Sequence, residues 1–236
     1  MEITFALGLK AWEDFNKEVH LLILQNEFID VAEIGGGANP LLTLEFINEK
    51  KLNYDVLDIS IDELEKADTK YNKIALDLEK PIDNPKVKYD FIFAQMTMEH
   101  INDPHTFYSN VYKLLNTGGQ AYFFFACVTS LPSFINYIIP EALSEKILLA
   151  LQPFRHNEKH GKFKAFYKWC LGPTSKNINR YKKLNFTIVS YTGYFGHSYY
   201  QRVKFLHFLE KIKTSILLKY PFSYLCSYAH VILKKS

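Results

Sequence analysis

Cysteine and net charge are both scarce in this sequence, and each shortage excludes a class of protein. The 236 residues include only three cysteines, far apart and odd in number, so neither a disulfide framework nor a zinc motif is indicated. We therefore expect a reducing compartment, the cytoplasm. The net charge of +3 argues against nucleic-acid binding, because nucleic-acid-binding proteins carry a concentrated basic face.

The sequence also lacks a signal peptide and an uninterrupted membrane-spanning run. The N-terminus MEITFALGLKAWEDF has early acids and no basic segment before a long apolar stretch. The most apolar window, AYFFFACVTSLPSFINYII, is interrupted by Pro132 and Asn136. It therefore predicts a buried strand followed by an amphipathic segment and not a membrane span, although peripheral membrane contact stays open.

Short apolar strands alternate with helical segments through the first half of the chain. We expect strands near residues 28–34, 53–60, 73–81, 88–96 and 119–128. Helices are expected near 11–28, 39–50, 60–68 and 103–115; Pro40 suits a first helical turn, and Ser60 with Glu63 forms a capping box. This alternation predicts βαβ units and a parallel sheet with helices on both faces.

The second half has a different pattern. Residues 131–172 contain helical stretches and no strand pattern, which indicates an insertion or lid. A helix and a sixth strand are expected over 174–194, and a last strand over 225–235. The segment 199–220 predicts a long amphipathic helix. We expect its apolar stripe to pack on the sheet; a partner or a membrane surface is the alternative.

Three consecutive glycines follow the first strand of the alternating region, in VAEIGGGANP. Glycine permits positive φ and lets a ligand approach the backbone. Asp58 ends the next strand about 20 residues later, where an acid often accepts hydrogen bonds from ribose hydroxyls. Asp77 ends the strand after that. The alternative for both acids is that each only caps the following helix or turn.

The segments VAEIGGGANP, YDVLDIS, ALDLEKP and YDFIFAQMTMEHINDP, over roughly residues 30 to 127, together resemble class I S-adenosylmethionine-dependent methyltransferases of the small-molecule type. The resemblance implies an α/β, Rossmann-like fold with a mostly parallel seven-stranded sheet, helices on both faces, an antiparallel last strand and a helical insertion or lid. It also implies S-adenosylmethionine as cofactor, with S-adenosylhomocysteine as product. The cofactor-binding residues that it implies are Glu33, Gly35, Gly36, Gly37, Asn39, Asp58, Ile59, Asp77, Leu78, Gln95 and Met96.

Two of these positions carry a further argument. Asn39 stands where the family often has a third glycine, so its cofactor contact is uncertain. Glu33 precedes the glycines; its charge would repel a pyrophosphate and suits an ammonium and a sulfonium. This disfavours a NAD(P)-dependent oxidoreductase, which is the second hypothesis. The third is a non-catalytic methyltransferase-like module that binds a partner.

Histidines and aromatic residues indicate how the acceptor is handled. If the acceptor is a hydroxyl, a general base helps to remove its proton, and histidine suits that role near neutral pH. The candidate bases are His100, in MEHI, and His197. Cations and aromatic faces in two further segments, RHNEKHGKFKAFYKW and GYFGHSYYQR, suit an anionic or sugar-bearing acceptor. The candidate substrate-binding residues are Arg155, His156, His160, Tyr194 and Tyr199.

These two segments faintly resemble methyltransferases of bacterial surface-polysaccharide biosynthesis. That resemblance implies a small sugar or sugar-linked acceptor, phosphorylated in some cases, with oxygen favoured over nitrogen. His156 and His160 have helical metal-pair spacing without a third ligand, so we expect no metal. We expect one methyltransferase domain over 1–236, divided into a helical segment (1–29), a cofactor-binding core (30–127), a helical insertion (128–185) and C-terminal strands with a helix (186–236).

Overall fold

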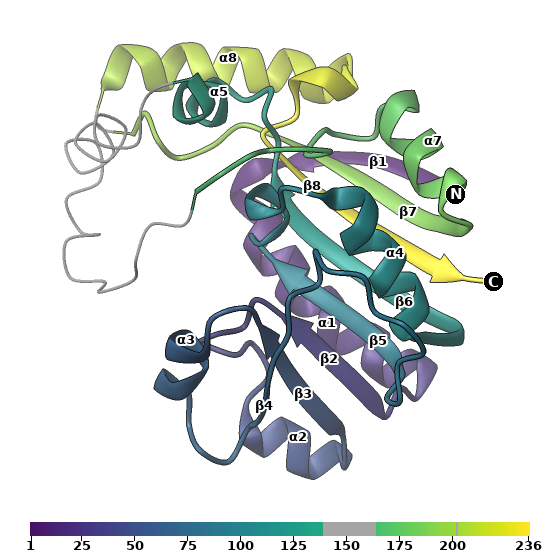
Figure 1. Cartoon of the computed structure of the whole chain (residues 1–236). Helices are drawn as coiled ribbons and strands as arrows, with labels where there is room; N and C mark the ends of the chain where they lie inside the picture. Colours follow the sequence, from purple (N-terminus) through teal and green to yellow (C-terminus); the bar gives the residue numbers. More distant parts are fainter. Residues whose placement is uncertain (139–163, 202) are drawn as a thin grey trace.

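An eight-stranded sheet runs through the centre of the computed structural model, which describes residues 1–138, 164–201 and 203–236 (Figure 1). The strand β8 runs antiparallel to both of its neighbours, β6 and β7, and the other neighbouring pairs are parallel. This confirms the predicted α/β fold and its antiparallel last strand. In spatial order the strands are β1 (Glu2–Leu7), β7 (Phe186–Phe195), β8 (Tyr228–Lys235), β6 (Leu115–Ala126), β5 (Tyr89–Gln95), β2 (Asp30–Ile34), β3 (Asn53–Asp58) and β4 (Asn72–Ala75).

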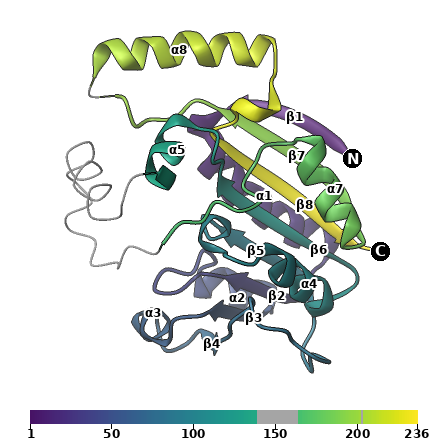
Figure 2. The same ribbon diagram turned by 45° about the horizontal axis from the view of Figure 1, so that its top comes forward.

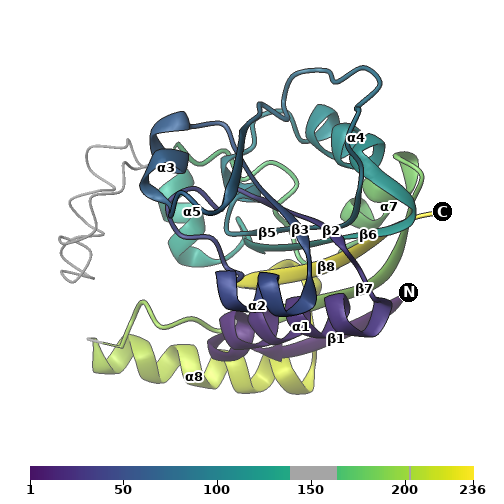
Figure 3. The same cartoon turned by 90° about the horizontal axis from the view of Figure 1, so that it is seen from below.

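Helices cover both faces of this sheet, as Figure 3 shows from below. The helices α1 (Ala11–Asn26) and α2 (Leu44–Lys50) lie on one face, and α4 (Pro104–Leu114) and α7 (Ser175–Lys183) lie on the other. No helix of the described residues is long and apolar enough to cross a bilayer. The remaining elements are α3 (Ile61–Lys66), α5 (Leu131–Ile138), α8 (Lys204–Lys219) and the short 3₁₀ helices η1 (Gly8–Lys10), η2 (Met98–His100) and η4 (Ser223–Leu225).

The central strand β6 shows why the sheet is covered on both sides. Its residues Phe123 and Phe125 pack in the core beneath α4 and α7, whereas Tyr122 and Phe124 pack in the core beneath α1. Successive side chains of a strand point to opposite faces, so a near-continuous apolar run requires two apolar layers. The prediction that this strand is buried on both faces is confirmed.

The predicted number of strands was wrong by one, because β1 was not foreseen. This strand pairs in parallel with β7, in a register that places Glu2 opposite Ser190. The hydroxyls of Thr4 and Thr192 lie 2.8 Å apart across the pair. A six-residue strand with several exposed side chains carries little periodic signal, and its partner lies far away in sequence.

Two predicted helix starts need comment. The helix α2 begins at Leu44 and not at Pro40, because the hydroxyl of Thr43 caps it by accepting the N–H of Phe46. Ser60 caps α3 as predicted, accepting the N–H of Glu63. The N–H of Ser60, which a capping box would give to the Glu63 side chain, donates to Asp58.

The orientation of α8 contradicts the prediction that its apolar stripe packs on the sheet. Figures 1 and 2 show α8 lying across the top of the molecule, beyond β7. Its buried residues are Glu210, Thr214 and Leu217, whereas Phe208 and Ile216 of the apolar stripe are exposed. Helical periodicity reveals that an apolar face exists but not whether the protein covers it.

Candidate active site

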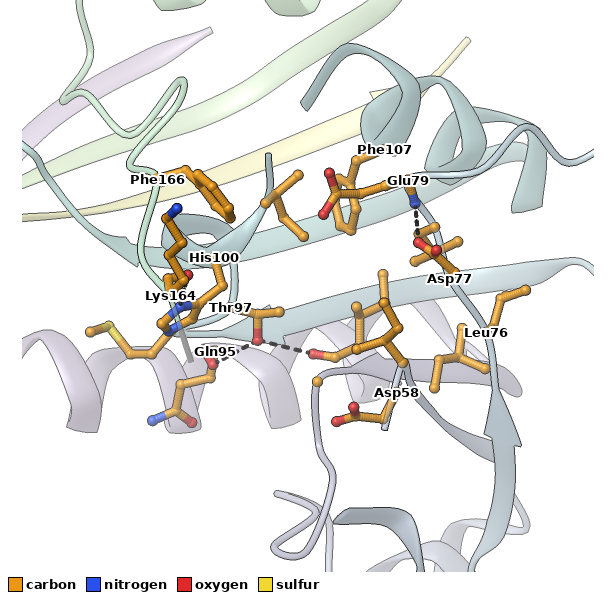
Figure 4. Close-up of a pocket in the computed structure, with 17 residues that line it drawn as sticks. Asp58, Leu76, Asp77, Glu79, Gln95, Thr97, His100, Phe107, Lys164 and Phe166 are labelled. Atoms are coloured by element: carbon orange, nitrogen blue, oxygen red, sulfur yellow. Dashed lines mark hydrogen bonds between the residues drawn. The ribbon is translucent and has the colours of Figure 1, made fainter. Parts of the chain in front are cut away.

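A cavity of about 370 Å³ lies where β2, β3 and β5 end at their carboxyl termini (Figure 4). In an open α/β sheet this is the edge at which ligands bind. Seven of the eleven predicted cofactor residues line it: Gly35, Asp58, Ile59, Asp77, Leu78, Gln95 and Met96. It is also lined by Ile34, Leu57, Leu76, Glu79, Thr97, His100, Ile101, Phe107, Lys164 and Phe166.

Gly35 forms the rim of this cavity and requires the absence of a side chain. Its φ is +75°, and a Cβ added there would lie 2.3 Å from Oγ1 of Thr97. The Thr97 hydroxyl is fixed by donating to the carbonyl of Gln95 at 3.1 Å (Figure 4). Glycine at this position therefore lets the turn pack closely against Thr97 with a positive φ while its backbone lines the cavity.

The rest of the glycine turn lies behind the rim and does not line the cavity. Gly37 also has a positive φ, +38°, and a Cβ there would lie 3.1 Å from Oδ2 of Asp58. The N–H of Asn39 donates to the carbonyl of Gly36 at 2.9 Å, which closes the turn. These residues shape the loop that presents Gly35.

Glu33 likewise lies outside the cavity lining, in a buried position below the glycine turn. Its Oε2 accepts the N–H of Leu41 at 2.8 Å and the hydroxyl of Tyr54. Burial raises the pKa of Glu33 to about 7, although these hydrogen bonds oppose the shift. The carboxyl group thus ties the loop after the glycines to β3, and a direct role at the methionine end of a cofactor stays a prediction.

Asp58 and Asp77 line the cavity and also stabilise the turns that follow them. Oδ1 of Asp58 accepts the N–H of Ser60 at 2.9 Å, and burial raises the pKa of Asp58. Oδ1 of Asp77 accepts the N–H of Glu79 at 3.0 Å, and Oδ2 lies 3.2 Å from Nζ of Lys80. Both alternatives raised by the sequence, capping and ligand binding, are therefore compatible with one geometry.

The backbone at the end of β5 is strained where it meets the cavity. Met96 has a φ of +51°, an uncommon value for a residue other than glycine, and its N–H donates to the carbonyl of Phe124 at 2.8 Å. Strained residues of this kind often occur at ligand sites. The turn directs Gln95 and Met96 into the cavity lining.

His100, in η2, is the candidate base that lines the cavity. Its Nδ1 lies 3.0 Å from the carbonyl oxygen of Lys164. A carbonyl only accepts, so Nδ1 carries the proton and Nε2 is the basic nitrogen of the neutral ring. Burial lowers the pKa of His100, which favours this neutral form.

A short segment, Lys164–Tyr167, covers this end of the cavity and is hereafter called the strap. The N–H groups of Phe166 and Tyr167 donate to the carbonyl of Glu99 at 2.7 and 2.9 Å. The carboxyl group of Glu99 is buried, which raises its pKa to about 8, and Oε2 has no hydrogen-bond partner among the described residues. Sequence reasoning noted this basic and aromatic stretch but not Lys164 and Phe166 as lining residues.

The second candidate base, His197, does not line the cavity. Its Nε2 lies 3.5 Å from Oε1 of Glu210 beneath α8, and burial lowers its pKa to about 4. Tyr199 is in ring contact with His197 at 5.5 Å. The hydroxyl of Tyr194 points to α1, donating to Asp14 at 3.1 Å. The predicted substrate residues Arg155, His156 and His160 lie outside the described residues.

The hydrogen-bond acceptors and apolar side chains of the cavity suit S-adenosylmethionine. Two carboxylates at neighbouring strand ends match the hydroxyls and amino group of an adenosine, and the apolar side chains of Leu57, Ile59 and Leu78 match its flat base. Within the described part of the chain, no group of three or more His, Cys, Asp or Glu side chains has the geometry of a metal site.

Comparison with known proteins gives a family match and many fold matches. The family model described as a methyltransferase domain matches residues 10–170, more than half of the 236 residues. No curated protein matched.

Among solved structures, an S-adenosylmethionine-dependent methyltransferase from Clostridium acetobutylicum ATCC 824 has a TM-score of 0.56 and 14% identity, covering 95% of this chain and 91% of that chain. The N-methyltransferase NodS from Bradyrhizobium japonicum WM9 has a TM-score of 0.52 and 13% identity, covering 95% and 96%. An O-methyltransferase from a trans-AT PKS multienzyme of Brevibacillus brevis, in complex with S-adenosyl-L-homocysteine, has a TM-score of 0.54 and 14% identity, covering 90% and 68%.

At these identities the solved structures show the fold, and the family model shows the relationship. The predicted fold and cofactor agree with both findings. The chain belongs to the class I S-adenosylmethionine-dependent methyltransferases, with S-adenosylmethionine as its cofactor.

Proposed function

We propose that this methyltransferase methylates a hydroxyl group of a small sugar or sugar-linked metabolite, including phosphorylated ones, in cytoplasmic bacterial glycan biosynthesis. The observation that carries the choice of oxygen is the place of His100 in the cavity lining, with its Nδ1 3.0 Å from the carbonyl oxygen of Lys164. Amines that are already deprotonated need no base, whereas a hydroxyl gains from one as its oxygen attacks.

For the cofactor we propose contacts that follow the lining of the cavity. Asp58 accepts hydrogen bonds from the ribose hydroxyls, Ile59 packs on the adenine, and Asp77 with the backbone of Leu78 meets the adenine edge. Gln95 and Met96 lie beside the methionine portion. Glu33 supports this arrangement from below through its bond to the loop at Leu41.

The reaction then requires little covalent chemistry from the protein. The bound cofactor supplies a methyl group on a sulfonium, which is already a good leaving group. The residues of the chain hold the acceptor hydroxyl in line with that methyl and exclude water. As the new O–C bond forms and the S–C bond breaks, the hydroxyl proton passes to Nε2 of His100.

The strap supports an acceptor that carries a sugar or an anion. Nζ of Lys164 lies over the ring of Phe166, 5.3 Å from its centroid, and both residues line the cavity. A cation attracts phosphate or carboxylate, and an aromatic ring stacks on a sugar. Between the two candidate bases we propose His100, because it lines the cavity and His197 does not.

The test measures methyl transfer from labelled S-adenosylmethionine to a panel of nucleoside diphosphate hexoses and their amino-sugar analogues. We expect methyl transfer to a hydroxyl. We expect kcat/KM to fall as the pH falls through a value below the ordinary histidine pKa of about 6.5. We expect His100→Gln to lower kcat by about a hundredfold or more. Asp58→Asn keeps an acceptor for Ser60 and should weaken cofactor binding by about 1 kcal/mol or more in calorimetry.

Matched controls separate these effects from damage to the fold. Asp83→Asn removes an exposed carboxylate that does not line the cavity and should leave cofactor affinity unchanged. Full turnover by His100→Gln, or methyl transfer only to amino-sugars, would contradict the proposed base and the choice of oxygen. An unchanged affinity in Asp58→Asn would mean that the ribose assignment is wrong.

A further inference from the structure

The outward face of α8 is a continuous apolar stripe. Phe205, Phe208, Leu209, Ile212 and Ile216 follow one another at positions i, i+3, i+4, i+7 and i+11, so they share one face of the helix. Their side chains are exposed by 69%, 59%, 45%, 42% and 55%. Single exposed apolar residues are common in proteins, but a contiguous stripe of this length marks an interaction surface.

Two of the three buried residues of α8 are polar, so the fold does not depend on the exposed stripe. Glu210 and Thr214 are buried against the end of β7, and Nε2 of His197 lies 3.5 Å from Oε1 of Glu210. Oγ1 of Thr214 has no hydrogen-bond partner among the described residues. A helix that serves only to cover a core has the reverse arrangement, with its apolar residues inside.

The charge of this helix suits an anionic surface. Lys204, Lys211 and Lys219 are exposed. The single acid between residues 203 and 225, Glu210, is buried and lies 2.7 Å from Nζ of Lys213. An apolar face accompanied by lysines is the composition of helices that lie in the plane of a bilayer and are attracted to anionic lipids.

Aromatic residues continue this surface beyond the end of the helix. Tyr220, Phe222 and Tyr224 are exposed by 66%, 54% and 44%. Tyrosine and tryptophan are enriched at the interface between lipid headgroups and acyl chains, where an apolar ring and a polar tip are both accommodated.

The helix also lies at the edge of the sheet at which the cavity opens. β6 and β7 are both antiparallel to β8, so they run in the same direction as each other and as β5 and β2. α8 follows the carboxyl end of β7, and the cavity lies at the carboxyl ends of β2, β3 and β5 (Figures 1 and 2). A surface bound by α8 therefore lies on the same side of the sheet as the cavity.

We propose that the apolar stripe of α8, with Tyr220, Phe222 and Tyr224, docks on the surface of an anionic phospholipid bilayer. The stripe enters the boundary between headgroups and acyl chains, and the exposed lysines contact lipid phosphates. A second copy of the chain is a poorer occupant, because pairing through this face would bring lysines together without exposed acids of α8 to neutralise them.

The test is flotation of the full chain with vesicles made of equal parts phosphatidylglycerol and phosphatidylcholine. We expect the wild-type protein to bind, and the double variant Phe208→Ser, Ile212→Ser to lose about tenfold or more in partition coefficient. Leu24→Ser, Val87→Ser is the matched control, since it removes two apolar side chains of similar exposure elsewhere. Vesicles of phosphatidylcholine alone should bind less protein, because the attraction to the lysines is absent.

Calorimetry with S-adenosylhomocysteine checks that every variant keeps its fold. No binding of the wild-type protein to the anionic vesicles overturns the proposal. Equal binding by the Phe208→Ser, Ile212→Ser variant also overturns it. The third outcome that overturns it is a wild-type protein that does not bind the vesicles and forms a dimer in sedimentation velocity, if the double variant is monomeric. A second copy of the chain would then occupy the face.

Discussion

Two helices of sixteen residues, α1 and α8, both carry an apolar stripe but turn it in opposite directions. In α1 the residues Phe15, Val19 and Ile23 are buried against the sheet. In α8 the corresponding stripe is exposed, and Glu210 and Thr214 are buried instead. The pattern of a helix therefore predicts that two faces differ, and the tertiary structure decides which face meets the protein.

One substitution in each helix tests this contrast, and the substitution in α1 should have the largest effect on stability. Phe15→Ala removes a fully buried ring that packs on Tyr122 and Phe124, and should lower the free energy of unfolding by about 3–5 kcal/mol. Phe208→Ala removes a ring that the fold does not cover, so it should change stability by less than about 0.5 kcal/mol. Urea denaturation of both variants measures the difference, and equal losses would mean that α8 is covered in solution.

A second prediction compares the histidines beneath the two helices. His230 packs on Phe15 with a pKa that burial lowers to about 3, and His197 lies beneath α8 with a pKa lowered to about 4. Both rings are neutral in the folded protein, whereas an unfolded histidine binds a proton below about pH 6.5. The unfolded state therefore takes up more protons between pH 6.5 and the folded pKa, and stability falls as the pH falls through that range.

The measurement is urea denaturation at pH 7 and pH 5. Each histidine should contribute up to about 2 kcal/mol to the loss of stability between these pH values. His230→Asn and His197→Asn should each remove part of that loss, whatever they cost at pH 7. A pH dependence that persists unchanged in both variants would assign the acid sensitivity to other groups.

A third prediction exchanges a buried apolar residue of α1 and a buried polar residue of α8. Val19→Thr buries a hydroxyl in the apolar face of α1 and should cost about 1–3 kcal/mol. Thr214→Val removes a buried hydroxyl that has no partner among the described residues, so it should be neutral or stabilising by about 1 kcal/mol. Thermal denaturation compares them, and a large loss in Thr214→Val would show that the hydroxyl is bonded in solution.

Local patterns were sufficient for most of the fold. The helix α1 and the alternating strands follow from periodicity and turn residues within a few positions, whereas the antiparallel direction of the last strand came from the family resemblance. The orientation of α8 and the existence of β1 depend on partners far along the chain, and no local pattern contains them. The start of α2 was misjudged because the Thr43 hydroxyl competes with Pro40 as a start signal.

The residues of the candidate site likewise fall into those that a local pattern predicts and those that depend on distant contacts. Asp58 and Asp77 were found from their places at strand ends, and both line the cavity. Glu33 does not line the cavity and accepts hydrogen bonds from Leu41 and Tyr54, so its expected role at the cofactor stays a prediction. The contact between His100 and Lys164 joins positions 64 residues apart, a separation that composition and spacing do not predict.

The parallel pairing of β1 with β7 also has a consequence for synthesis of the chain. β1 is synthesised before its partner strand, which ends at Phe195. The backbone groups that β1 gives to β7 stay without that partner until the chain has been made through Phe195. Contacts of this sequence separation slow folding, and translation proceeds from the N-terminus. β1 therefore pairs with β7 only after the intervening strands β2 to β6 have been made.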